Sequence, residues 1–263
     1  MKTNSTSDIV KVLEKNNELL RIKHQVDPHL EMAEIQRRIY RDNGPAILFE
    51  NVKDCQFQCI SNIYGTTKRA KLLFKKTYNA VRSIISAKGD PVGLLKHPFG
   101  AMQALVTAGY GLPLKVPNSV APVMQCRAKL EDLPQIVSWP MDGGAYITLP
   151  QVYSEHPDYL GNPLKSNLGM YRIQISGNNY IPNKEIGLHY QIHRGIGVHQ
   201  KLHIDQNKPF RVAVFIGGSP SMAFSAVMPL PEGLPEVAFS GLMAGRNYRY
   251  TKYRDWTLAA DAD

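Results

Sequence analysis

The 263-residue chain carries 31 lysines and arginines against 22 aspartates and glutamates, and 43% of its residues are hydrophobic, as in an ordinary globular protein. Cys55, Cys59 and Cys126 are too few, and odd in number, for a disulfide framework, and no apolar run is long enough for a membrane span. The net charge of +9 gathers in part at 68–76 and 246–254, and we interpret these basic stretches as solvated faces of the protein. We therefore expect a cytoplasmic protein with reduced thiols that binds no nucleic acid.

The first part of the chain alternates helical and strand patterns. Ser5-Thr6-Ser7-Asp8 predicts the cap of a helix, because short polar side chains accept hydrogen bonds from first-turn N–H groups. The elements expected next are a strand at 19–22, a helix from Asp27-Pro28 to Gly44-Pro45, buried strands at 46–52 and 57–60, and a basic helix near 67–86. The stretch from the 90s to the 120s is rich in glycine and proline, which favours a connection between two domains.

The second part is predicted to be mainly short strands. They are expected at 123–127, 146–149, 169–175, 187–193, 211–216 and 246–253, with a short helix at 222–228 and a helix or extended connection at 232–241. The pattern as a whole predicts an α+β protein.

Residues 167–199 hold most of the chemistry: an asparagine, two arginines, histidines four residues apart and paired glycines. From 170 to 175 the side chains alternate, so that Arg172 and Gln174 lie on one strand face. A polar face that meets another polar face is costly to bury without a ligand. We therefore expect this segment to form one wall of a binding site.

Several separate motifs, in order along nearly the whole chain, resemble the UbiD family of reversible, non-oxidative decarboxylases. They occupy 20–22, 26–31, 44–52, 62–65, 167–172, 193–195 and 235–241. The resemblance implies an α/β domain over 1–115, followed over 116–263 by a split β-barrel of the flavin-reductase type that binds prenylated FMN. It also implies Mn²⁺ or Mg²⁺, with K⁺ by the same analogy, and an aromatic or α,β-unsaturated carboxylic acid as substrate. A flavin prenyltransferase would supply the cofactor, and the full-length protein would be a homo-oligomer.

The resemblance assigns roles residue by residue. Asn167, His193 and Glu236 match the metal ligands, and amide, imidazole and carboxylate donors suit Mn²⁺ or Mg²⁺ at a phosphate. Arg172 matches the site arginine and is the catalytic candidate, since a guanidinium offers a fixed fork of donors to a carboxylate or a flavin carbonyl. The residues that match cofactor contacts are Met170, Tyr171, Arg172, His189, Tyr190, Gln191, Arg194 and Gly195.

The chain also departs from the family. In the family, the catalytic acids lie a long way after the metal-binding glutamate. Here the residues from Glu236 to Asp263 are too few to include them, and no part of the sequence matches the large C-terminal domain. We therefore expect an N-terminal portion of such an enzyme, without a matching proton donor and nearly inactive alone. Glu232 and Asp255 are the acidic candidates near the motif, and neither stands in a matching context.

Two other interpretations stay open at this point. His189, His193 and His199 have the spacing of a metalloprotease zinc signature, but Tyr190 stands where the general-base glutamate belongs, and Pro182 with the Gly-Ile-Gly opposes the long helix needed. A non-catalytic flavin-binding or assembly subunit would keep Asn167, Arg172, His193 and Glu236 and do no chemistry.

Overall fold

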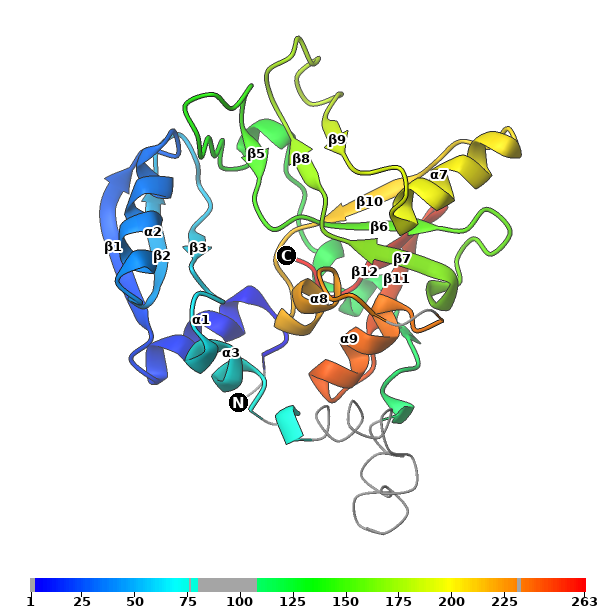
Figure 1. Ribbon diagram of the computed structural model, residues 1–263, viewed down its shortest axis with the longest axis horizontal. Helices are drawn as coiled ribbons and strands as arrows, with labels where there is room; N and C mark the ends of the chain where they lie inside the picture. The colour runs from blue at the N-terminus through cyan, green and yellow to red at the C-terminus, as the bar shows by residue number, and fades with distance from the viewer. Residues whose placement is uncertain (1–2, 76, 80–107, 231–232) are drawn as a thin grey trace. The chain divides into compact units, whose positions relative to one another are not determined.

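The computed structural model describes residues 3–75, 77–79, 108–230 and 233–263, which divide into two compact units. Unit 1 consists of Met1–Leu73, Cys126–Pro150 and Tyr171–Tyr190; unit 2 consists of Phe74–Gln125, Gln151–Met170 and Gln191–Asp263. The boundary at 115/116 stays a prediction, and most of the predicted linker lies outside the described residues. The α+β class is confirmed, because helices and strands are mixed in both units (Figure 1).

Unit 1 contains a small α/β layer near the amino terminus. Its helices are α1 (Thr6–Lys15), α2 (Glu31–Arg41) and α3 (Thr67–Leu73), and its strands are β1 (Leu19–Val26), β2 (Ala46–Val52) and β3 (Cys59–Ser61). Strand β2 is central, parallel to β1 and antiparallel to β3. The predicted cap is confirmed, since the Ser5 hydroxyl accepts a hydrogen bond from the Asp8 N–H at 3.2 Å.

The buried face of this layer follows from the sequence pattern. Ile47 and Phe49 on β2 are fully buried and pack with Val26 and Met32, and Ile35 and Ile39 of α2 lie against the same cluster. Since Met32, Ile35 and Ile39 are spaced three and four residues apart, they share one helix face. Helix α2 begins at Glu31 rather than at Pro28, because Leu30 turns into the left-handed region with φ 68°.

The second sheet of unit 1 joins segments from the middle of the chain. Strands β5 (Tyr146–Ile147) and β9 (Gly187–His189) flank β8 (Arg172–Gln174), and both pairings are antiparallel. The 3₁₀ turn η3 (Leu130–Asp132) precedes them along the chain. The single strand predicted over 169–175 is wrong: the chain leaves one sheet at Gly169 and enters another at Arg172.

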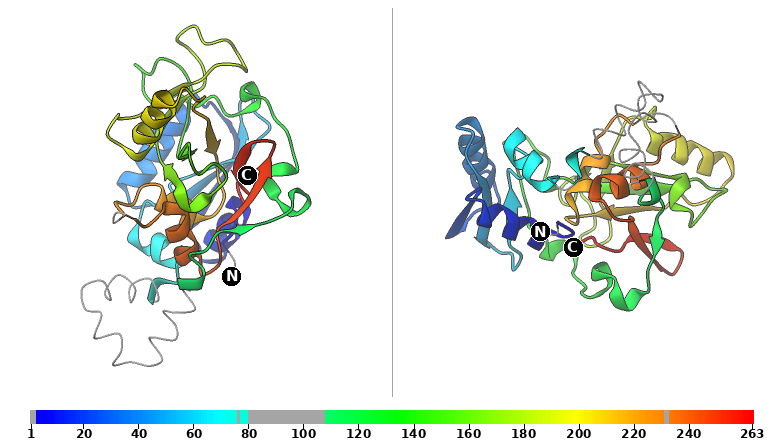
Figure 2. Two further views of the ribbon diagram at one scale, coloured as in Figure 1. Left: turned by 90° about the vertical axis from the view of Figure 1, so that its right-hand side faces the viewer. Right: turned by 90° about the horizontal axis from the view of Figure 1, so that it is seen from below.

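The part of unit 2 that the structure describes has two further sheets. In one, β6 (Gln151–Glu155) lies between β7 (Ser166–Gly169) and β10 (Val212–Phe215); in the other, β11 (Arg249–Tyr253) lies between β4 (Leu114–Lys115) and β12 (Trp256–Ala259). Figure 2 shows β11 and β12 side by side as a hairpin. The helices of its described residues are α7 (Gly195–Asp205), α8 (Pro220–Ser225) and α9 (Glu236–Ala244), and short 3₁₀ turns lie at η1 (Asn118–Val120), η2 (Pro122–Met124) and η4 (Pro163–Lys165).

Three predictions in this region are wrong or incomplete. Residues 123–127 form no strand, because a 3₁₀ turn occupies the first part of the segment. The strand from Gly187 ends at His189, and an unpredicted helix, α7, begins at Gly195. The basic helix expected near 67–86 is present as α3, and residues 76 and 80–86 lie outside the described part of the chain.

Helix α9 packs against neighbouring backbone at a glycine. A methyl group at Gly241 would come within 2.0 Å of the Tyr110 carbonyl oxygen, and backbone atoms cannot move aside as a flexible side chain would. We therefore expect Gly241→Ala to lower the free energy of unfolding by about 1–3 kcal/mol in urea unfolding, as overpacking does. Gly109→Ala is the matched control, because nothing lies within 4 Å of its added methyl group. Equal effects of the two substitutions would contradict this packing argument.

Candidate cofactor and metal site

In unit 2 the ends of β7, α7 and α9 bring the predicted metal ligands Asn167 and Glu236 near one another. Asn167 is on β7, and the backbone N–H of the next residue, Leu168, donates a hydrogen bond to Glu236 Oε2 at 3.2 Å. Glu236 is the first residue of α9, where the positive end of the helix dipole favours a carboxylate. Helix α9 contacts β7 directly, as Figure 1 shows.

The electrostatics of Glu236 are unusual. Its side chain is half-buried, and burial raises the pKa of the carboxyl group above its ordinary value, although the backbone N–H groups of Glu236 and Leu168 act in the opposite direction. In the described part of the chain no lysine or arginine forms an ion pair with it. A buried carboxylate without a cation is costly, so the site would gain from a bound metal ion.

Helix α7 presents its amino terminus to Asn167. A methyl group on Gly195, the first helical residue, would lie 2.1 Å from Asn167 Oδ1, so a larger residue here would displace the Asn167 amide. Arg194 precedes the helix in an extended conformation, and its side chain makes no capping hydrogen bond to α7. The first-turn N–H groups of a helix are donors suited to a phosphate.

Three other predicted residues of unit 2 lie in the segment before α7: Gln191, His193 and Arg194. The exposed His193 stands two residues ahead of the helix. Arg194 Nε donates to Gln191 Oε1 at 3.3 Å, and Met170 N–H donates to the Ala226 carbonyl at 3.1 Å. Met170 is thus held by backbone just after the end of β7.

Unit 1 holds the other predicted residues on β8, on β9 and beside them. Arg172 pairs directly with His189 in the register of β8 and β9, and the rings of Tyr171 and Tyr190 meet edge to face with centroids 6.1 Å apart. The prediction that the segment from Gly187 returns alongside the strand that carries Arg172 is confirmed. Their side chains nonetheless belong to the unit that also contains the amino-terminal layer.

Sequence reasoning missed the partners of Arg172. Its guanidinium forms an ion pair with Asp142 and stacks over the Tyr146 ring, with its central carbon 3.9 Å from the ring centroid. The Asp142 side chain is only 8% exposed and also accepts the Trp139 N–H. No sequence motif links residues 142 and 172; only the pairing of β5 with β8 brings them together.

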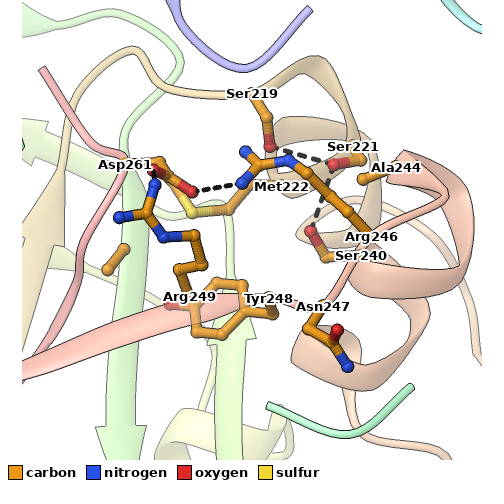
Figure 3. Close-up of a pocket in the computed structure, with 11 residues that line it drawn as sticks. Ser219, Ser221, Met222, Ser240, Ala244, Arg246, Asn247, Tyr248, Arg249 and Asp261 are labelled. Carbon is orange, nitrogen blue, oxygen red and sulfur yellow. Dashed lines mark hydrogen bonds and ion pairs between the residues drawn. The ribbon is translucent and has the colours of Figure 1, made fainter. Parts of the chain in front are cut away.

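Each unit also contains a cavity. One, of about 490 Å³, lies in unit 1 and is lined in part by Asp27, His29, Lys53, Asp142 and Ser176. The other, in unit 2, is enclosed by buried serines and by the pairs of Arg246 and Arg249 with Asp261 (Figure 3). Its volume of about 10 Å³ admits at most a water molecule, so it is no substrate site.

The zinc-protease hypothesis is excluded by the local structure. His189 is in a strand and His193 precedes α7, so the two do not share a helix turn. In the ranges described, no three His, Cys, Asp or Glu side chains gather closely enough for a metal ion. Of the predicted ligands, only His193 and Glu236 are residues of these types. Nor is any described helix sufficiently long and apolar to span a bilayer.

Two family models match most of the chain. The model for the Rift-related domain of 3-octaprenyl-4-hydroxybenzoate carboxy-lyase, UbiD, matches residues 115–263, and the model for its N-terminal domain matches residues 10–88. The chain therefore belongs to the UbiD family.

Relatives in other organisms are consistent with this assignment. An uncharacterized Chlamydia trachomatis protein is 35% identical over 254 residues, which are 94% of this chain and 42% of that protein. A Chlamydia pneumoniae protein named as a subunit of 4-hydroxybenzoate decarboxylase is 33% identical, with 94% and 41% covered. The chain thus spans less than half the length of these relatives.

Among solved structures, vanillic acid decarboxylase from Sedimentibacter hydroxybenzoicus in its closed form has a TM-score of 0.78 at 22% identity, covering 100% of this chain and 54% of that one. The UbiD-class enzyme HmfF from Pelotomaculum thermopropionicum in complex with FMN has a TM-score of 0.74 at 20% identity, with 98% and 53% covered. These likenesses establish a shared fold.

Proposed function

We propose that this chain supplies the prenylated-FMN and metal-binding part of a UbiD-type decarboxylase. The observation that carries the proposal is the half-buried Glu236 carboxylate, which has no paired cation among the described residues and is hydrogen-bonded to the residue that follows Asn167. The substrate would be an aromatic or α,β-unsaturated carboxylic acid, in keeping with the vanillic acid and 4-hydroxybenzoate decarboxylases among the similar proteins.

The residues present fit the proposed group. Asn167 and Glu236 offer oxygen donors and His193 a nitrogen donor to Mn²⁺ or Mg²⁺, and the amino terminus of α7 offers N–H groups to a phosphate. The lack of a side chain on Gly195 leaves room for the Asn167 amide at this end of the helix. Bound prenylated FMN would supply an electron sink for decarboxylation. Arg194 would add charge at the phosphate.

Arg172 is the residue proposed to orient the substrate carboxylate or the flavin. Its fork of donors is held in place by Asp142 and by the Tyr146 ring, so less side-chain freedom is lost on binding. Tyr171, His189, Tyr190 and Gln191 would line the cofactor. The sheets of unit 2 would be parts of the split β-barrel implied by the resemblance. The same proposal includes a bound K⁺ ion, homo-oligomerisation of a full-length protein and a cytoplasmic location.

A non-catalytic flavin-binding or assembly subunit is the second candidate. The Chlamydia pneumoniae relative is named as a subunit, and the Arg172 guanidinium is already engaged by a carboxylate of this chain. This candidate predicts the same flavin and metal binding without CO₂ release, so turnover separates the two.

The test is co-expression of the chain with a flavin prenyltransferase. We expect a coloured protein that retains flavin through gel filtration when Mn²⁺ is present and loses it after metal removal, because Asn167, His193 and Glu236 would hold a metal ion whose charge favours binding of the phosphate. Expression without the prenyltransferase is the control for cofactor identity, read by mass spectrometry of the released flavin. A colourless protein, or flavin retention indifferent to metal and to Asn167→Ala, would contradict the proposal.

A further inference from the structure

A buried serine lies across the strand pair from Asn167 and forms a hydrogen bond with a histidine of α7. Strands β6 and β7 are antiparallel, and their register places Ser154 opposite Asn167, so the two side chains are neighbours on one sheet face. Ser154 is 1% exposed, and its Oγ lies 3.0 Å from His199 Nδ1. His199 is on α7, one helical turn after Gly195.

These contacts form a closed ring of four residues. Ser154 is the cross-strand partner of Asn167, the Asn167 amide touches the backbone at Gly195, Gly195 is one turn from His199, and His199 returns to Ser154. The hydrogen bond therefore fixes the distance between the first turn of α7 and the strand that carries Asn167. Burial, with His156 and His203 nearby, lowers the pKa of His199 to about 4, so the ring holds no additional charge near pH 7.

We infer that Ser154 and His199 are positioning residues that hold the Asn167 side chain and the amino terminus of α7 in their metal- and phosphate-binding geometry. This inference rests on the proposed function and extends it to two residues outside the family motifs. Loss of an outer-shell partner typically weakens metal binding about 10- to 100-fold. Without the hydrogen bond, α7 can shift at Gly195 and the amide gains rotamers that do not face the metal.

The same helix offers a matched control. His203 lies one turn further along α7, is 3% exposed and has its Nε2 3.1 Å from the Glu155 carbonyl oxygen. It thus ties α7 to β6 as His199 does, but away from Asn167. If His199 were only a packing residue, His199→Ala and His203→Ala would have the same effects.

The experiment is Mn²⁺ titration of the chain in the presence of FMN, with free Mn²⁺ followed by electron paramagnetic resonance. We expect His199→Ala and Ser154→Ala to raise the dissociation constant about tenfold or more. His203→Ala should lower thermal stability and leave the dissociation constant unchanged. His199→Asn should restore most of the affinity, because the asparagine amide occupies the place of Nδ1. Parent-like affinity in His199→Ala, or equal weakening in His203→Ala, would overturn the inference.

A second readout does not depend on the metal. The side-chain amide resonances of Asn167, assigned by their loss in Asn167→Ala, should shift or broaden in metal-free His199→Ala and not in His203→Ala. If the parent binds neither Mn²⁺ nor FMN, the proposed function fails and these resonances still decide the positioning role. Unchanged resonances in His199→Ala would refute it, whether or not the parent binds metal.

Discussion

Replacing Glu236 with glutamine is expected to abolish Mn²⁺-dependent flavin retention and to leave the metal-free protein at least as stable as the parent. Glutamine keeps the size of the side chain and an oxygen that can accept the Leu168 N–H, but it removes the half-buried negative charge. Loss of a direct ligand should exceed the roughly 10- to 100-fold cost of losing an outer-shell partner. The measurements are Mn²⁺ titration with FMN and urea unfolding without metal.

The burial of Glu236 should also determine how stability and Mn²⁺ affinity depend on pH. Because burial raises the pKa of Glu236, the folded protein binds this proton more tightly than the unfolded chain does. The contribution of this group to the free energy of unfolding therefore decreases as the pH rises from the ordinary glutamate pKa through the raised one. Metal binding needs the ionised form, so Mn²⁺ affinity should fall as the pH is lowered through the raised pKa. Glu236→Gln should remove both dependences.

Asp255→Asn is the control for the loss of a carboxylate in unit 2. Asp255 is 77% exposed and pairs with Arg211 at 3.1 Å, so an effect on metal binding is not expected. If Glu236→Gln keeps the parent's Mn²⁺ affinity, or if both substitutions weaken it equally, the assignment of Glu236 as a ligand is wrong.

Decarboxylation by this chain, loaded with prenylated FMN and Mn²⁺, is expected to be slower than that of a full-length family member by about 10²–10⁴-fold, the usual contribution of a positioned acid. Three acids with described positions are engaged elsewhere: Glu185 accepts the Ile181 N–H, Asp255 pairs with Arg211, and Asp142 holds Arg172. Glu232 lies outside the described residues. The measurement is CO₂ release from cinnamic-, hydroxybenzoic- and furoic-type acids.

Substitution of Asp142 tests the prediction of slow decarboxylation. With a positioning role only, Asp142→Asn should loosen Arg172 and weaken flavin or substrate binding without removing a proton-transfer step. Rapid CO₂ release by the parent chain, abolished in Asp142→Asn without loss of flavin, would instead identify Asp142 as the proton donor and contradict the prediction. Arg172→Lys keeps the positive charge but should bind the flavin or the substrate more weakly than the parent does, because lysine lacks the planar fork of donors.

The α+β class, the elements with strong local signals and the family could all be predicted from the order of the residues. Ser5 capping α1 and the apolar stripe of α2 are local effects, set by hydrogen bonds and side-chain spacing within one or two turns. The motifs around Asn167, Arg172 and Glu236 were sufficient for the family, since residue types at fixed spacings are what a motif records.

The strand pairing and the side-chain partners of the motif residues depend on contacts between distant segments. The continuous alternation over 169–175 hid a change of sheet, because a period of two shows that a segment is extended and not which strand it pairs with. Helix α7 was missed since Gly195 and Gly197 weaken helical propensity, yet both are required by close backbone or amide neighbours. The pairs Arg172–Asp142 and Ser154–His199 join residues 30 and 45 positions apart, a separation that no local pattern encodes.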